Sequence, residues 1–88
     1  MRIIFQFELR LLCKQTYTMP EGSKMLSIQL RNTRLFLWTE VDQNRNSEQV
    51  TIHSFATNEE IPLNLKLEHI STVQMGYNVW HFYKEINN

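Results

Sequence analysis

The chain has 88 residues, of which nine are Lys or Arg and nine are Asp or Glu, so its formal net charge is zero. This length predicts one domain, and five Phe, three Tyr and two Trp among 42% hydrophobic residues argue against general disorder. The zero balance excludes the simplest electrostatic reason for binding bulk nucleic acid or an anionic membrane. No apolar run reaches the length that spans a bilayer, so we expect no membrane association.

Apolar and polar residues alternate with a period of two along most of the chain, which predicts strands. In the first, Arg2–Arg10, the odd-numbered residues are apolar and form one face. A short second strand, Gln15–Met19, is expected at a sheet edge. The sequence then predicts a turn in which Pro20 fixes φ at the second position and Gly22 takes a positive φ.

The next two strands are predicted to form a hairpin. Lys24–Arg31 alternates again, and three of its side chains are expected to point inward: Leu26, Ile28 and Leu30. Asn32-Thr33 closes a tight turn into Arg34–Asp42. This last strand is apolar on both faces, which is typical of a central strand or of one whose second face is covered.

The second half of the chain contains two polar loops, near residues 43–48 and 57–64. Between them Val50–Ala56 is a predicted strand, and Val79–Glu85 is a terminal one. Residues 65–75 fit either a helix or a strand. Six or seven short strands separated by turns predict an all-β fold over residues 1–88, a single small antiparallel β-sandwich or an open barrel.

The sequence carries no catalytic or metal-binding motif. Cys13 is the single cysteine, so no internal disulfide forms, and a reducing cytoplasm fits best. His53, His69 and His81 lack the close spacing of zinc ligands. Phosphate-binding loops, nucleophile elbows and zinc-protease motifs are also missing. We therefore expect no metal, no cofactor and no enzymatic activity; a hydrolase that uses His53 or His81 with a carboxylate is the enzymatic alternative.

Charge is unevenly distributed along the chain. Residues 1–34 carry six basic and two acidic side chains, and residues 35–88 carry three basic and seven acidic ones. If their strands are neighbours, Arg10, Arg31 and Arg34 form a candidate anion-binding patch; otherwise they are charged strand edges that oppose aggregation. The candidate acidic surface consists of Glu40, Asp42, Glu59 and Glu60, and its first pair would supply the carboxylate of the hydrolase alternative.

Two tryptophans lie on strand faces other than those that the apolar alternation assigns to the main core. Trp38 and Trp80, beside Phe36 and Phe82, are expected to form a second layer of the core. The alternatives are an exposed patch for a partner or a surface on which a nucleobase stacks. Trp38 and Trp80 are therefore also candidate binding residues.

Five segments of the chain form a recognisable combination: Met19–Gln29, Leu37-Trp38, Val41-Asp42, Ile52–Thr57 and Val79–Phe82. The most distinctive is the first, an MPEGSKxLSxQ-type turn and strand. Together they resemble a family of small bacteriophage proteins of unknown function, and the similarity spans residues 3–85. The resemblance implies a phage gene product that acts in the cytoplasm of the bacterial host.

The resemblance and the lack of motifs lead to a functional hypothesis. Small phage proteins without motifs often inhibit host defence, so we expect a non-enzymatic protein that binds a host defence protein, such as a CRISPR–Cas component, stoichiometrically. One alternative is a homo-oligomeric sponge for a nucleotide immune signal, with Arg31 or Arg34 on phosphate and Trp38 or Trp80 on the base. Another is a structural or assembly component of the phage.

Overall fold

A computed structural model describes residues 1–86, which form seven antiparallel strands and no helix. The all-β prediction is therefore confirmed. No segment within these residues is a helix long and apolar enough to cross a membrane. The strands are β1 (Arg2–Leu9), β2 (Lys14–Pro20), β3 (Lys24–Arg31), β4 (Arg34–Asp42), β5 (Ser47–Ala56), β6 (Leu67–Met75) and β7 (Asn78–Glu85).

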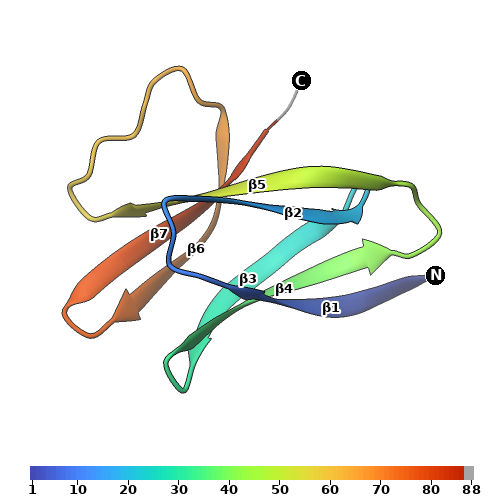
Figure 1. The fold of residues 1–88 in the computed structure, drawn as a ribbon, viewed down its shortest axis with the longest axis horizontal. Coiled ribbons are helices and arrows are strands. Elements are labelled where there is room, and N and C mark those ends of the chain that lie inside the picture. Colours follow the sequence, from blue (N-terminus) through green and yellow to red (C-terminus); the bar gives the residue numbers. More distant parts are fainter. Residues whose placement is uncertain (87–88) are drawn as a thin grey trace.

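The strands form two sheets rather than a closed barrel (Figure 1). The three-stranded sheet has the order β1-β4-β3, and the four-stranded sheet has the order β2-β5-β7-β6. The central position of β4 confirms what its two apolar faces predict, and β2 lies at an edge as expected. The ambiguous residues 65–75 contain β6, which pairs with β7. The polar loops are residues 43–46, two residues shorter than expected, and residues 57–66.

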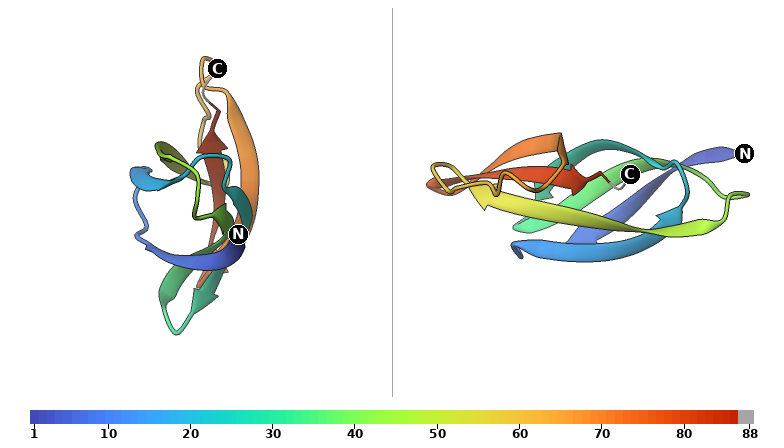
Figure 2. Two further views of the ribbon diagram at one scale, coloured as in Figure 1. Left: turned by 90° about the vertical axis from the view of Figure 1, so that its right-hand side faces the viewer. Right: turned by 90° about the horizontal axis from the view of Figure 1, so that it is seen from above.

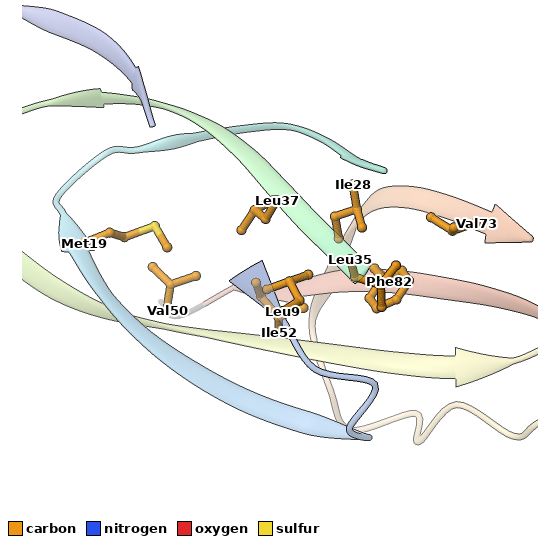
Figure 3. Close-up of a cluster of buried hydrophobic side chains, with 9 residues drawn as sticks. All are labelled: Leu9, Met19, Ile28, Leu35, Leu37, Val50, Ile52, Val73 and Phe82. Atoms are coloured by element: carbon orange, nitrogen blue, oxygen red, sulfur yellow. The ribbon is translucent and has the colours of Figure 1, made fainter. Parts of the chain in front are cut away.

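The inner faces of the two sheets enclose a small core (Figure 3). Leu37, Ile52 and Phe82 are completely buried. The molecule is thin, with principal extents of 40 × 34 × 15 Å, and Figure 2 shows the same flatness in two further views. A domain of this size encloses little volume, so large apolar side chains remain at its surface. The core residues are Leu9, Met19, Ile28, Leu35, Leu37, Val50, Ile52, Val73 and Phe82.

The two sheets are joined where the edge strands β3 and β6 meet. Each strand has a β-bulge here, between Met25 and Ser27 in β3 and between His69 and Ser71 in β6. The backbone N–H of Ile28 donates a hydrogen bond of 2.8 Å to the Ser71 hydroxyl. A serine side chain therefore satisfies a donor that a continuous sheet would satisfy with a carbonyl.

The β3 bulge changes which residues face the core. Leu26 and Ser27 together oppose Trp38, so Met25 takes the inward position before Ile28. Leu26 is consequently 39% exposed. The prediction that Leu26 points inward is wrong, because strict alternation does not allow for an inserted residue.

Two tight turns contain residues with a positive φ. Asn32 and Thr33 have φ of 48° and 70°, which are the positive values of a type I′ hairpin turn. Gly22 has a φ of 75°, as expected. Pro20 accepts the closing bond from Ser23 at 3.3 Å, so it is the first residue of its turn and not the second.

Candidate binding surfaces

The outer face of the three-stranded sheet is built around β4. Leu35, Leu37, Thr39 and Val41 of β4 are buried, and the alternating residues from Arg34 to Asp42 point the other way. Phe36 and Trp38 occupy the centre of that outer face and are half-buried. Their strand is apolar on both sides, yet within residues 1–86 only one side packs against the other sheet.

Apolar side chains continue across the neighbouring strands on this face. Ile4 of β1 pairs with Glu40 and is 64% exposed, and Leu26 of the β3 bulge opposes Trp38. We call Ile4, Leu26, Phe36 and Trp38 the apolar band. The indole Nε1 of Trp38 is buried without a hydrogen-bond partner among residues 1–86. A buried N–H group without an acceptor is energetically unfavourable, and few side chains in folded proteins have one.

The structure separates the two tryptophans. Trp80 lies on the inner face of β7 and packs against the core, as predicted. Trp38 lies in the apolar band on the opposite side of its sheet, so its predicted core position is wrong. The reason is topological, because β4 turns its other face toward the core.

The three candidate arginines gather at one end of the three-stranded sheet, which we call the arginine end. Arg31 and Arg34 are direct partners across the hairpin. Arg10 follows Leu9, and Leu9 pairs with Leu35, the residue next to Arg34. Arg34 binds the Glu8 carboxylate with both Nε (3.0 Å) and Nη2 (2.7 Å). Within the described chain, neither Arg10 nor Arg31 is in a salt bridge.

The opposite end of this sheet is neutralised by ion pairs. Arg2 Nη1 is 3.0 Å from Glu40 Oε2, and Asp42 accepts the N-terminal ammonium at 3.5 Å. The backbone N–H of Asn44, together with this ammonium and Arg45, lowers the pKa of Asp42. A cavity of about 200 Å³ at this end is lined by charged side chains of both signs: Arg2, Glu21, Lys24, Glu40, Asp42 and Arg45.

The four candidate acidic residues do not form one surface. Glu40 and Asp42 lie on the outer face of the three-stranded sheet, whereas Glu59 and Glu60 lie in the loop that follows β5 of the other sheet. Glu59 Oε1 accepts the Ala56 N–H at 2.9 Å, so this carboxylate caps the end of β5.

The outer face of the four-stranded sheet carries the histidines, and it brings two of them together. Thr72 Oγ1 is 3.0 Å from both His69 Nε2 and His81 Nδ1, and His81 Nε2 is 2.9 Å from Thr57 Oγ1. His53 instead bonds Glu85 through Nε2 at 3.1 Å. The convergence was not predictable from spacing, because the β6–β7 pairing creates it.

These contacts link the two imidazoles into one hydrogen-bonded chain. It runs from His69 through Thr72 and His81 to Thr57, whose hydroxyl also lies 3.4 Å from Val79 O. The direction of each bond in the chain follows the tautomers of the two rings. A cavity of about 210 Å³ adjoins it, and Phe55, Ile61, His81 and Tyr83 are among the residues that line it.

The structure does not assemble the alternative hydrolase site. Glu40 and Asp42 are on the three-stranded sheet, and His53 and His81 are on the outer face of the four-stranded sheet. No group of three or more His, Cys, Asp or Glu side chains within residues 1–86 is placed to hold a metal ion. Cys13 is exposed in the loop between β1 and β2.

A further apolar feature lies where the edge strands β1 and β2 border the open side of the sandwich. A cavity of about 200 Å³ is lined there by Phe5, Phe7, Thr18, Pro20, Val41 and Gln43. Phe5 and Phe7 are neighbours with ring centroids 4.9 Å apart, and Phe5 is 46% exposed. Alternation correctly placed Phe5 on the inner face, but it does not reveal that the opposing sheet ends before covering it.

A family model for a domain of unknown function, DUF7352, matches residues 1–88. The chain belongs to this family. No curated protein and no solved structure matches it. The DUF7352 match spans every strand of both sheets, so the arginine end, the apolar band and the histidines on the outer face of the four-stranded sheet are all parts of the family domain.

Proposed function

We propose that this DUF7352 domain is a stoichiometric binding protein that docks on a protein partner through the outer face of its three-stranded sheet. The observation that carries the proposal is the apolar band beside the arginine end on one sheet face. Protein interfaces typically combine a desolvated aromatic centre with a charged rim, and Trp and Arg are the residues enriched at their energetic centres.

The partner surface is expected to be acidic around an apolar centre. Arg10 and Arg31 have no carboxylate partner within the described chain. The Arg34–Glu8 pair is solvent-exposed, with side-chain exposures of 62% and 47%. Exposed ion pairs contribute little to stability, so Arg34 can exchange Glu8 for a carboxylate of the partner at small cost.

The hairpin turn supports this assignment. Thr33, a β-branched residue, has a φ of 70° directly between Arg31 and Arg34. Such a conformation is strained for Thr and is tolerated where a rigid turn is needed. The turn fixes Arg31 and Arg34 as directly opposed residues before any partner binds.

A host defence protein remains our proposed partner, and the resemblance to small phage proteins supports it. The bacterial cytoplasm is the corresponding site of action. In this role the domain would occupy a surface that the defence protein needs, without turning over a substrate.

Charge reversal tests the proposal on a partner recovered from host lysate with tagged protein and identified by mass spectrometry. Arg31→Glu should weaken binding at least tenfold and reduce its salt dependence, because it removes one attractive pair and adds a repulsive one. The matched control is Lys66→Glu, which makes the same change in the loop before β6. Equal affinities of both variants and the unmodified protein would exclude the arginine end as the docking site, and recovery of a virion protein would favour an assembly role.

A second function is favoured by one observation on β4. Arg34, Phe36 and Trp38 alternate along the same face, and the Arg34 guanidinium carbon lies 6.0 Å from the Phe36 ring centre. A phosphate on Arg34 and a base on an aromatic ring would give the nucleotide sponge. Trp80 cannot serve as its stacking residue, because it packs against the core. Native mass spectrometry would then show a nucleotide-sized mass that Arg34→Ala loses.

A further inference from the structure

The free edge of β1 can be mapped residue by residue. Gln43 N–H donates to Met1 O at 3.3 Å, and the β1–β4 register continues without a break from Arg2 to Leu9. Hydrogen-bonded pairs alternate in an antiparallel ladder. The backbone groups of odd-numbered residues therefore face β4, and those of even-numbered residues face away from the sheet.

Side chains of β2 already occupy one half of this edge. Tyr17 Oη donates to Glu8 O at 3.1 Å, and the Gln15 amide bonds both N–H (3.2 Å) and C=O (2.8 Å) of Arg10. These contacts agree with the alternation, because Glu8 and Arg10 are even-numbered. Among residues 1–86 nothing satisfies the outward backbone groups of Arg2, Ile4 and Gln6.

The unsatisfied half of the edge is also the apolar half. Ile4 is 64% exposed on the outer face, and Phe5 is 46% exposed on the inner face beside the cavity that Phe7 and Val41 line. A long, apolar, unpaired edge strand normally aggregates unless something covers it. No proline or lysine within β1 blocks such pairing.

We propose that a second copy of the chain covers this edge, with β1 pairing antiparallel to β1 of the partner subunit about a two-fold axis at Phe5. The sequence of β1 is self-complementary in this register. Arg2 faces Glu8 of the partner subunit, and Ile4 faces Gln6 of the partner subunit. Opposite charges in directly opposed strand positions are stabilising, and like charges are destabilising.

Neighbouring registers do not provide this match. An axis at Ile4 places Arg2 opposite the amide of the partner's Gln6, and an axis at Gln6 places Arg2 opposite the partner's Arg10. Both leave Arg2 without a carboxylate across the edge. In the Phe5 register, the intramolecular pairs Arg2–Glu40 and Glu8–Arg34 extend into a row of alternating charges across the dimer.

The pairing also satisfies the bare backbone groups of Ile4 and Gln6 and covers apolar surface. Even-numbered residues oppose even-numbered residues, so each Ile4–Gln6 pair exchanges two backbone hydrogen bonds. The two Phe5 rings meet at the axis in the close, non-hydrogen-bonded position. The result is a six-stranded sheet of order β3-β4-β1-β1-β4-β3, whose two apolar bands lie on the same face. The dimer does not rest on the proposed partner binding.

The oligomeric state tests the proposal. Sedimentation equilibrium on the full chain at about 100 μM should give twice the chain mass, and a monomer at this concentration would overturn it. Arg2→Glu and Glu8→Arg should each weaken dimerisation at least tenfold, because each creates like-charge pairs. Ile4→Pro should do the same, since it removes an outward N–H while leaving the β4 ladder intact. Far-UV circular dichroism establishes that each variant remains folded.

Mixing the two charge variants tests the register. An equimolar mixture of Arg2→Glu and Glu8→Arg should form a heterodimer, because every opposed pair is again of opposite sign. In the matched control, Arg45→Glu mixed with Glu8→Arg, the Arg45→Glu chains keep Arg2 and Glu8 and should form homodimers, while the Glu8→Arg chains should stay monomeric and no heterodimer should form. A mixture that stays monomeric, or single variants that dimerise as tightly as the unmodified chain, would overturn the Phe5 register. Failure of the protein-partner experiment would leave this result unaffected.

Discussion

The hydroxyl of Ser71 is the contact whose removal should most specifically weaken the junction between the two sheets. Ser71→Ala leaves the N–H of Ile28, a residue that is only 4% exposed, without its acceptor at 2.8 Å. An unsatisfied buried donor costs about 1–3 kcal/mol. A domain of this length has a total stability of about 4–13 kcal/mol at 0.05–0.15 kcal/mol per residue, so the loss is a large fraction.

Urea unfolding followed by tryptophan fluorescence measures this loss. With a slope near 1 kcal/mol/M, as for other small domains, the midpoint should fall by about 1 M or more. Ser27→Ala is the matched control, because Ser27 lies in the opposing bulge and its hydroxyl makes no hydrogen bond within residues 1–86. The reasoning would be refuted if Ser71→Ala lowered the free energy of unfolding by less than about 0.3 kcal/mol, which is within the usual scatter of such comparisons. Equal decreases for Ser71→Ala and Ser27→Ala would refute it as well.

Four further substitutions test other parts of the structure. Leu37→Ala, at a completely buried site, should lower the free energy of unfolding by about 2–5 kcal/mol in the same urea assay. Thr33→Gly should raise it by about 0.5–1 kcal/mol, because glycine adopts the φ of 70° without strain; a loss would contradict the I′ turn. Burial raises the pKa of Tyr17, so the folded state holds the phenol proton longer than the unfolded state does. This contribution is intact below about pH 10 and is lost as the pH rises further, and Tyr17→Phe should reduce the fall in urea midpoint between pH 8 and 11. Arg34→Ala should cost less than about 1 kcal/mol, because its pair with Glu8 is exposed.

Much of the fold follows from local patterns. Alternation predicts the strands, Asn32-Thr33 predicts a tight hairpin turn, and the two apolar faces of β4 predict its central position. These features depend on residues close together in the chain. The β3 and β6 bulges do not, because each forms where two edge strands from different sheets meet. The exposure of Leu26 therefore needed the tertiary structure.

The candidate site shows the same division. A hairpin necessarily brings Arg31 and Arg34 together, so their proximity was predictable from the turn. Arg10 joins them because β1 pairs with β4 rather than with β2, its neighbour in sequence. The convergence of His69 and His81 on Thr72 likewise depends on the register of β6 against β7. Strand order and register are set by non-local packing, and composition does not encode them.

Strand order also decides what the uneven charge distribution means. The acidic Glu40 and Asp42 belong to β4, which lies between β1, with one basic and one acidic residue, and the basic strand β3. Ion pairs with Arg2 and the N-terminus therefore cancel the acidic charge at one end of the sheet. At the other end Glu8 offsets only part of the charge of three arginines. In the folded domain, an excess of positive charge thus remains only at the arginine end. An acidic partner would meet this local excess rather than the net charge of the chain, which is zero.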